Sequence, residues 1–426
     1  MPKARSSTSG FFYADLKLPE ILIRIRPGAI LFPYHRAFRA TVVHMLGFRL
    51  LKTVVGKLTR TNALRMCAAA VCVFAGVSAS AQSVVFLNPG KSDEAYWRSS
   101  ADAMQKAADS LGMQLRVLYA QRNRLEPVAM AKRLAHLPQR ERPDYVVFSN
   151  DYSTAPSILK ALDGSGIQAF MAFSGIQDDL RPQVGMPRGQ FPFWLGSLES
   201  NAEDAGYLTA QALIQKALKI PALRDAQGKL QMVAIAGDRS TPASTARNQG
   251  MRKAVREMQG TVVLRQEVYG EWRQDKARDQ AQVLFQRYPE VRLIWAGNDL
   301  MAFGAMEAWR QQGGEPGSDA LFSGINTSQQ ALDGLRKGQL TALAGGHFMA
   351  GAWAMVMLYD HYHGVDFLDE GLELQRNMFQ LFDARTSQQL EQHFAQTEVT
   401  LDFRAFSKHR NPQLRRYQFE LAQLLR

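Results

Sequence analysis

The sequence predicts a two-lobed α/β protein in which two parallel sheets are each flanked by helices. From Ser83 onward, short apolar runs alternate with amphipathic segments of helical length, the pattern of parallel βα units. The pattern runs through two cycles, and the second begins near Asn201. The 426 residues also exceed the size of one typical hydrophobic core, which favours two domains.

The first cycle predicts four strands and three helices. Its first helix places Trp97, Met104 and Leu111 on one apolar face, because these residues recur at helical spacing. The strands are predicted over 83–87, 113–118, 144–148 and 167–173, and the helices over 97–111, 128–137 and 155–162.

The second cycle repeats the alternation and adds a C-terminal part. Its strands are predicted over 230–236, 261–268, 291–296, 321–325, 340–345 and 378–382, and its helices over 201–212, 244–258, 277–285, 300–310 and 351–362. From Phe406 onward the tail, with Arg410, Arg415 and Arg416, is interpreted as a basic amphipathic helix with a solvated face.

The positive charge of the chain is concentrated at its N-terminal end. Residues 1–81 hold 12 Lys and Arg against 2 Asp and Glu, whereas the rest of the chain holds 39 against 37. The body therefore has no charge surplus with which to bind nucleic acid.

A secretory signal peptide is predicted just before the first strand. Basic residues precede the apolar run 66–77, and Ala79-Ser80-Ala81 supplies the small residues of a cleavage site after Ala81. A buried helix of the body is the alternative. Both cysteines, Cys67 and Cys72, lie in this run, so the body has no disulfides. Residues 1–44 are interpreted as a mis-assigned start or a poorly structured extension.

The loops after the predicted strands carry polar and aromatic residues that suit a ligand cleft. Ligands of open α/β sheets bind outside the carboxyl ends of the strands. Aromatic rings can stack on a sugar ring there, while carboxylates, amides and arginine bind hydroxyls. The candidates are Glu94, Tyr96, Trp97, Asp151, Arg247, Trp272, Asn298, Asn326 and His347.

Each candidate alone also has a structural interpretation. Trp97 can pack in the core, Glu94 can complement a helix N-terminus, Arg247 can lie on a solvated helix face, and Asn298 or Asn326 can cap the next helix. Together, at the mouths of both lobes, they describe a polar cleft with aromatic walls.

Sequence signatures of an enzyme are absent. The body has no metal-spaced His and Cys cluster, no nucleophile elbow, no complete Gly-x-x-x-x-Gly-Lys-Ser/Thr phosphate-binding loop and no cysteine. His347, beside Gly345-Gly346, is interpreted as a hydrogen-bonding or packing residue rather than a base. We therefore expect a binding protein without a catalytic residue, metal or cofactor.

Four segments, in this order, resemble the sugar-binding type I periplasmic binding proteins of the ribose and galactose kind over residues 83–400. They are Tyr96-Trp97, Ser244–Gly250 with its Arg-x-x-Gly pattern, Gly297–Ala305, and Gly324-Ile-Asn326 with the following Leu332 and Gly338. The resemblance implies two similar Rossmann-like lobes joined by a three-stranded hinge that closes over the ligand.

The resemblance also implies lobe boundaries. We expect an extension at 1–44, a signal peptide at 45–81, an N-terminal lobe at 82–197 plus 346–377, a C-terminal lobe at 198–345 plus 378–400, and a basic tail at 401–426.

By the same resemblance, Tyr96 or Trp97 and Trp272 would stack on the sugar, while Asp151, Arg247 and Asn298 would bind hydroxyls. Two positions depart from the family. Its usual aspartate is Asn326 here, and its usual glutamine falls on Gly346 or His347. The missing carboxylate weakens the case for a simple pentose and leaves room for a phosphorylated, amino or borate-containing ligand.

The resulting hypothesis is a monomeric periplasmic protein that delivers a small, sugar-like ligand to the membrane permease of an ABC-type importer. The opening loop also resembles autoinducer-binding members, so an accessory protein of a membrane sensor kinase is the alternative. A transcriptional repressor core shares the fold, but it would need a helix-turn-helix where this chain has its apolar secretion segment.

Overall fold

The computed structural model describes residues 81–394 and 401–424. The predicted extension (1–44) and the predicted signal peptide (45–81, apart from Ala81) lie outside the described residues. Among the described residues, no helix is both long and apolar enough to cross a membrane.

The first lobe is built on a six-stranded sheet in the order β11-β5-β4-β3-β1-β2, in which all neighbours are parallel. The strands are β1 (Ser83–Asn88), β2 (Gln114–Tyr119), β3 (Tyr145–Phe148), β4 (Gln168–Phe173), β5 (Trp194–Ser200) and β11 (Glu373–Arg376). The helices are α3 (Ala95–Leu111), α4 (Glu126–Ala135), α5 (Ala155–Leu162), α6 (Arg181–Val184) and α12 (Ala350–Tyr362).

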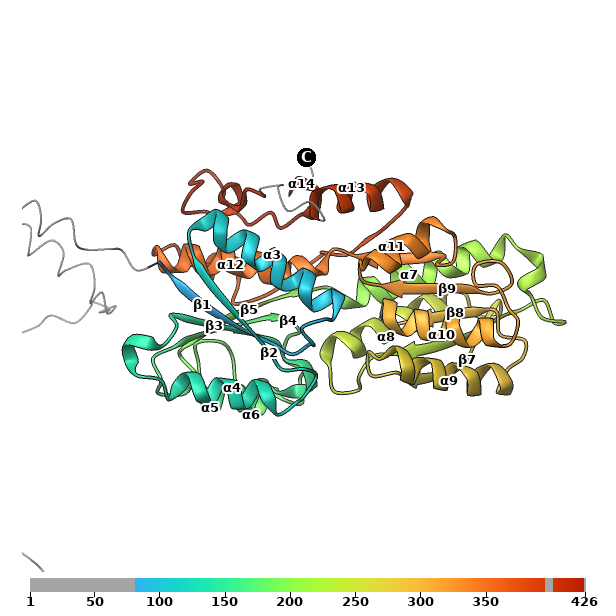
Figure 1. Cartoon of the computed structure of the whole chain (residues 1–426), viewed down its shortest axis with the longest axis horizontal. Coiled ribbons are helices and arrows are strands. Elements are labelled where there is room, and N and C mark those ends of the chain that lie inside the picture. Colours follow the sequence, from blue (N-terminus) through green and yellow to red (C-terminus); the bar gives the residue numbers. More distant parts are fainter. Residues whose placement is uncertain (1–80, 395–400, 425–426) are drawn as a thin grey trace, which may run out of the picture. The chain divides into compact units, whose positions relative to one another are not determined.

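Alternate residues of these strands face two different hydrophobic layers. Val84 and Phe86 pack with α3 and α12 on one face of the sheet, whereas Val85 and Leu87 pack with α4 and α5 on the other. Burial on both faces explains why the central strands read as continuous apolar runs. Figure 1 shows the two helical layers above and below this sheet.

The second lobe repeats the plan with the order β12-β10-β9-β8-β6-β7, and only β12 is antiparallel. Its strands are β6 (Leu230–Ala236), β7 (Val262–Tyr269), β8 (Leu293–Ala296), β9 (Leu321–Ile325), β10 (Ala342–Gly345) and β12 (Gln380–Leu381). Its helices are α7 (Ala202–Leu218), α8 (Pro242–Glu257), α9 (Gln274–Arg287), α10 (Asp299–Gln311), α11 (Gln329–Arg336) and α13 (Ala384–Phe394). Helices α7 and α8 pack together, as do α9 and α10.

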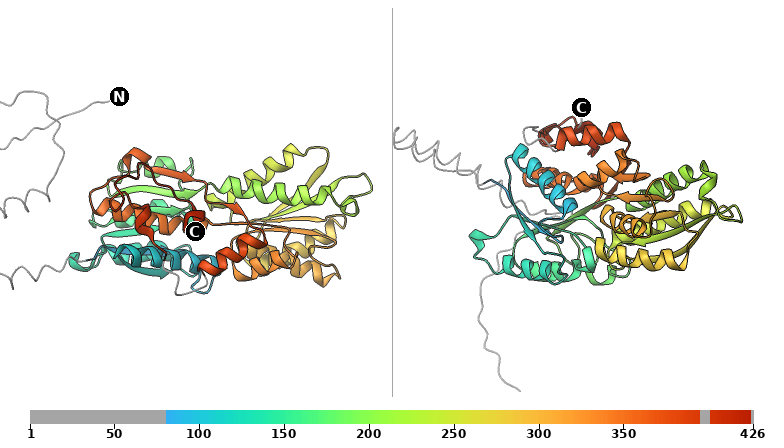
Figure 2. Two further views of the ribbon diagram at one scale, coloured as in Figure 1. Left: turned by 90° about the horizontal axis from the view of Figure 1, so that it is seen from above. Right: turned by 45° about the vertical axis from the view of Figure 1, so that its right-hand side comes forward.

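The chain passes between the two sheets three times. It leaves the first sheet after β5 to enter α7, returns after β10 to enter α12, and crosses again between β11 and β12. Figure 2 shows the two sheets joined by these segments. The predicted fold class, two similar α/β lobes with a three-stranded hinge, is confirmed.

The C-terminal segment, residues 401–424, does not form the predicted amphipathic helix. It is an irregular segment with one short 3-10 helix at Phe403–Phe406 and one helical turn, α14 (Leu421–Leu424). Its aromatic rings pack on the first lobe: Phe403, Phe406 and Phe419 surround Trp353 of α12 at ring-centroid distances of 4.9–5.5 Å. In Figures 1 and 2 this red segment lies beside α3 and α12.

A buried carboxylate ties the same segment to α12. Asp360 is fully buried and accepts hydrogen bonds from the hydroxyls of Ser407 and Tyr417 and from the backbone N–H groups of Lys408 and His409. Helix α12 is apolar around its whole circumference, with buried residues from Ala350 through Asp360. Such a helix needs cover on every side, and the C-terminal segment provides it on the outer side.

Candidate ligand-binding site

A cavity lies between the two lobes at the carboxyl ends of their strands. Each strand from β1 to β10 ends in, or is followed by, at least one residue that lines it. The lining residues are Glu94, Tyr96, Trp97, Arg122, Asp151, Phe173, Ser174, Ser200, Thr241, Ala243, Arg247, Trp272, Asn298, Asn326 and His347. The cavity therefore exists only while both lobes contribute to it.

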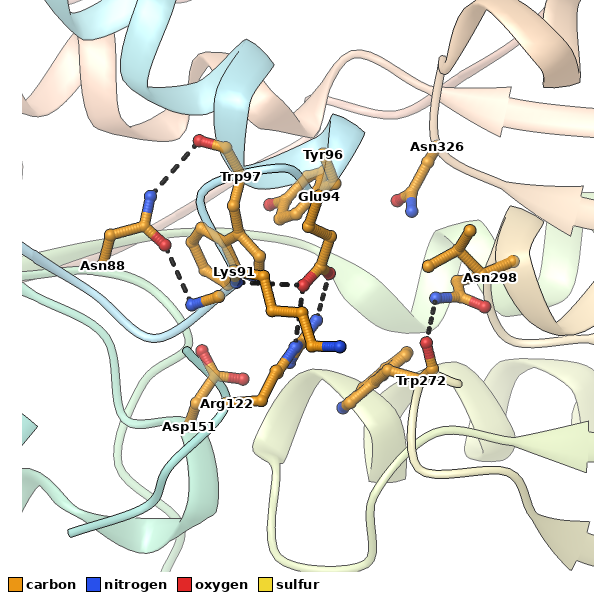
Figure 3. Close-up of polar contacts among 12 residues, drawn as sticks. Asn88, Lys91, Glu94, Tyr96, Trp97, Arg122, Asp151, Trp272, Asn298 and Asn326 are labelled. Atoms are coloured by element: carbon orange, nitrogen blue, oxygen red, sulfur yellow. Dashed lines mark hydrogen bonds and ion pairs between the residues drawn. The ribbon is translucent and has the colours of Figure 1, made fainter. Parts of the chain in front are cut away.

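Two tryptophans, one from each lobe, pack directly against glycines. A Cβ on Gly90 would lie 1.9 Å from Cδ1 of Trp97, and a Cβ on Gly237 would lie 2.3 Å from the ring of Trp272. Any larger residue at either glycine would displace the ring. The first wall continues with Phe173, whose ring meets that of Trp97 edge-on at 5.3 Å. Figure 3 shows Trp97 and Trp272 on opposite sides of the site.

An ion pair joins Glu94 to Arg122 within the first lobe. The guanidinium donates to both carboxylate oxygens, one of them at 2.9 Å, and the backbone N–H of Lys91 also donates to Glu94 (Figure 3). Burial alone would lower the pKa of Arg122, but the adjacent Glu94 carboxylate raises it above its ordinary value. Arg122 is therefore a permanent positive charge whose geometry is set by Glu94.

Asp151 brings a carboxylate with spare hydrogen-bonding capacity to the cavity. Its side chain is 5% exposed, and within the described residues it accepts one side-chain hydrogen bond, from Ser149 Oγ at 2.8 Å. Burial raises the pKa of Asp151, while the nearby Arg122 lowers it. A carboxylate can accept several hydrogen bonds, so Asp151 is ready to accept more from a ligand.

The position of Arg247 follows from close packing of α8 against α7. A Cβ on Gly206 would lie 1.8 Å from the backbone oxygen of Arg247, and one on Gly250 would lie 1.9 Å from that of Glu203. The two glycines let the helix backbones touch, and this explains the spacing of the Arg-x-x-Gly pattern. The side chain one turn before Gly250 is thereby directed into the cavity.

Arg247 carries a buried charge without a carboxylate in direct contact. It donates to the backbone oxygen of Gly297 at 2.7 Å and to Nε2 of His347 at 2.9 Å, and its guanidinium lies 5.4 Å from the ring centroid of Trp272. Burial lowers the pKa of Arg247 to about 10, partly offset by Tyr96 and Asp151. A buried cation of this kind gains from a ligand that accepts its hydrogen bonds.

The two asparagines of the second lobe are largely engaged within the protein. Asn298 caps α10 by accepting a hydrogen bond from the N–H of Met301 at 2.8 Å, as the capping interpretation predicts. Asn326 donates to Oδ1 of the buried Asp299 at 2.9 Å. Figure 3 shows Asn298 also directed to the backbone oxygen of Trp272, at 3.5 Å. They line the cavity, but their hydrogen bonds also maintain its wall.

Backbone strain is concentrated around the cavity. Four lining residues other than glycine have positive φ: Arg122 (60°), Trp272 (63°), Phe173 (75°) and Asn326 (109°). Such conformations are unfavourable for residues with a Cβ and persist where the surroundings impose them, often at binding sites.

Several buried polar atoms at the cavity have no partner among the described residues. They are Nε1 of Trp97, Nε1 of Trp272, Nε of Arg247 and Nδ1 of His347. A buried donor without an acceptor typically costs about 1–3 kcal/mol, so an acceptor atom that reached one of these atoms would stabilise the site.

All nine residues predicted from the sequence line this one cavity, and their role as ligand contacts stays a prediction. Sequence reasoning missed Arg122, Phe173, Ser174, Ser200, Thr241 and Ala243. The signal that could have found most of them is the same one, a position at or after the carboxyl end of a strand, here β2, β4, β5 and β6.

Comparison with known protein families identifies the family to which the chain belongs. The family model described as "Periplasmic binding protein domain" matches residues 84–364. The chain belongs to this periplasmic binding protein family. The predicted resemblance is thereby confirmed. A comparison with curated proteins finds no significant match.

Solved structures agree with this assignment. This periplasmic binding protein is 40% identical to a periplasmic sugar-binding protein from Pseudomonas fluorescens, with a TM-score of 0.73 over 81% of this chain and 100% of that one. The fold is also shared with the arabinose ABC transporter binding protein of Shewanella sp. ANA-3 (18% identity, TM-score 0.59, 72% and 94% coverage). A solute-binding protein from Actinobacillus succinogenes 130z with bound D-allose is similar as well (16%, 0.61, 72% and 99%).

Proposed function

We propose that this protein captures a neutral, sugar-like ligand by hinge closure and delivers it to the membrane permease of an ABC-type importer. The observation that carries the proposal is the cavity between the lobes, with aromatic walls and with carboxylate and guanidinium groups among its lining residues. Stacking rings and hydroxyl-binding groups on opposite sides are what a sugar ring requires. The export of the protein to the periplasm after cleavage at Ala81 is part of this proposal.

The charges that line the cavity favour a neutral ligand. Glu94 and Asp151 contribute two carboxylates, and Arg122 and Arg247 contribute two guanidiniums. Burial and Arg247 hold the pKa of His347 well below its ordinary value, so the ring is neutral at pH 7. The formal charges therefore cancel. A hydroxyl can donate to a carboxylate and accept from a guanidinium, whereas a phosphorylated ligand would bring uncompensated negative charge beside Asp151.

Transport is favoured over sensing by the relatives whose descriptions name ABC transporters. Both functions use the same closure, because a ligand that binds the closed form shifts the population toward it. A sensor kinase and a permease would therefore recognise the same closed conformation. A pull-down with each candidate membrane partner in the presence of ligand distinguishes sensing from transport.

A thermal-shift screen identifies the ligand. Neutral monosaccharides and polyols form one arm, and sugar phosphates and amino sugars form two others. We expect a neutral sugar to raise the melting temperature, because a ligand that binds only the folded state stabilises it. A rise with sugar phosphates alone would contradict the neutral-ligand proposal.

Two substitutions then test whether the ligand occupies this cavity. We expect Trp97→Ala and Arg247→Ala each to weaken binding by more than about 2 kcal/mol in calorimetric titrations, because both residues are buried and line the cavity. Arg239→Ala is the matched control, since Arg239 is an exposed arginine on the loop before α8. Unchanged affinity in both cavity variants, with intact melting curves, would place the site elsewhere.

A further inference from the structure

His347 lies where the chain returns from the second lobe to the first. It follows β10 and begins the short 3-10 helix His347–Met349 that leads into α12. The preceding Gly346 has a φ of 106°, a conformation that admits glycine most readily, and His347 itself is 4% exposed. The imidazole is therefore a fixed, buried part of the hinge.

Two aromatic rings hold the plane of this imidazole from both sides. Tyr96, at the start of α3 in the first lobe, stacks on it at 4.7 Å between ring centroids and 21° between planes. Phe379, in the crossover between β11 and β12, stacks on the other face at 4.3 Å and 26°. One hinge residue is thus clamped between the first lobe and another hinge strand.

The edge of the ring faces Arg247 of the second lobe. Nη2 of Arg247 lies 2.9 Å from Nε2 of His347. An arginine can only donate, so Nε2 must accept and the proton must lie on Nδ1. Around the ring, the described charged or titratable neighbours are Arg247 from α8 and Tyr96 from α3, and the Phe379 side is apolar.

We propose that His347 is a positioning residue, which holds the guanidinium of Arg247 toward the ligand while the rings of Tyr96 and Phe379 fix the plane of its imidazole. His347 is the one side chain among the described residues that accepts a hydrogen bond from Arg247. Without it, the guanidinium keeps the backbone oxygen of Gly297 and the rings of Trp272 and Phe379, but no described side chain then accepts a hydrogen bond from Nη2. The expected loss of ligand affinity rests on the proposed function, whereas the expected loss of a fixed Arg247 guanidinium does not.

The decisive experiment follows Arg247 directly by NMR, without ligand. In ¹⁵N-labelled protein we expect the His347 ring to show the tautomer protonated at Nδ1 at pH 7, and the Nη nitrogens of Arg247 to give separate signals because their rotation is hindered. In His347→Leu we expect those signals to merge, whereas His347→Gln, which keeps an acceptor oxygen, should retain them. Separate Nη signals in His347→Leu, or a ring protonated at Nε2, would overturn the proposal.

A second measurement connects the positioning role to binding. The sugar that gives the largest thermal shift is titrated into wild type, His347→Gln, His347→Leu and the exposed-histidine control His136→Leu. We expect His347→Leu to bind about 10- to 100-fold more weakly, as for a lost hydrogen bond to a charged group, with most of the affinity restored in His347→Gln. Equal affinity of His347→Leu and wild type would overturn the link to binding. If no sugar shifts the melting temperature, the proposed function fails while the NMR result still decides the role of His347.

Discussion

Glu199 shows how one residue of β5 makes stability depend on pH. Its carboxylate accepts the backbone N–H of Gly175 at 2.9 Å and is mostly shielded from water. Burial raises its pKa to about 7, with Gly175 opposing and Glu373 adding to the rise. Folding therefore favours the protonated carboxyl of Glu199 over the ionised carboxylate. Its stabilising contribution is complete below the pKa of the unfolded chain, near 4.5, and is lost as the pH rises through about 7.

We predict that Glu199→Gln removes this loss. Between pH 5 and 8 the wild type should lose about 1–3 kcal/mol of unfolding free energy that the variant keeps, because glutamine preserves the acceptor oxygen and cannot ionise. Urea unfolding at several pH values measures the difference. Parallel pH profiles of the two proteins would show that Glu199 does not titrate in this range.

For single residues, the sequence predicts a place in the cavity when an unusual side chain, such as a tryptophan or an arginine, follows an apolar strand. It does not predict residues whose place depends on a contact with a residue distant in the sequence. Trp97, Trp272 and Arg247 stand out after apolar strands, and all three line the cavity. Arg122 follows β2 without any distinctive neighbour, and its place becomes evident only from its ion pair with Glu94, 28 residues earlier. His347 could be located in a loop, but its contact with Arg247 spans 100 residues.

Among the elements, the contact of α7 with α8 determines where Arg247 points. We predict that Gly250→Ala lowers the free energy of unfolding by about 2 kcal/mol or more, because the added methyl would lie 1.9 Å from a backbone oxygen that cannot move independently. Gly334→Ala in α11 is the matched control. Its methyl would meet Leu340 at an ordinary 3.5 Å, so alanine should stabilise the helix by up to about 1 kcal/mol.

Chemical unfolding of the two variants measures both effects. A destabilisation of Gly334→Ala equal to that of Gly250→Ala would mean that helix propensity or backbone freedom, rather than the contact between α7 and α8, sets the stability at these glycines.

Elements with a clear apolar period could be predicted, and elements that depend on distant partners could not. The inner strands, such as β1, β3, β6 and β9, appear as apolar runs because they are buried between helical layers. The edge strands β2 and β7 are only partly buried and mix apolar with polar residues. Strand β5 carries Gly196, Ser197 and Glu199, and β11 reads Glu-Leu-Gln-Arg, so neither shows such a run. The C-terminal segment reads as a basic helix, but its aromatic residues bind Trp353 and its backbone donors bind Asp360 instead.

For the whole molecule, the described arrangement is a closed one. On the side of the cavity formed by the loops after β3, β4 and β6, the lobes contact each other directly. Ser153 Oγ donates to the backbone oxygen of Ser240 at 3.0 Å, and Gln177 Nε2 donates to Thr245 Oγ1 at 3.2 Å. These hydrogen bonds join residues more than 60 positions apart and must break if the hinge opens. Ligand affinity therefore includes the free energy of forming them.

The distance between the lobes is the most direct test of a protein that closes on its ligand. The sequence has cysteines only at positions 67 and 72, so residues 82–426 accept two engineered labels without competing thiols. Lys160→Cys on α5 and Val283→Cys on α9 place exposed spin labels on different lobes. With the sugar identified by thermal shift, we predict that pulsed electron resonance shows a broad, longer distance distribution without ligand and a narrow, shorter one with it. The same distribution with and without a sugar that calorimetry shows to be bound would contradict the account.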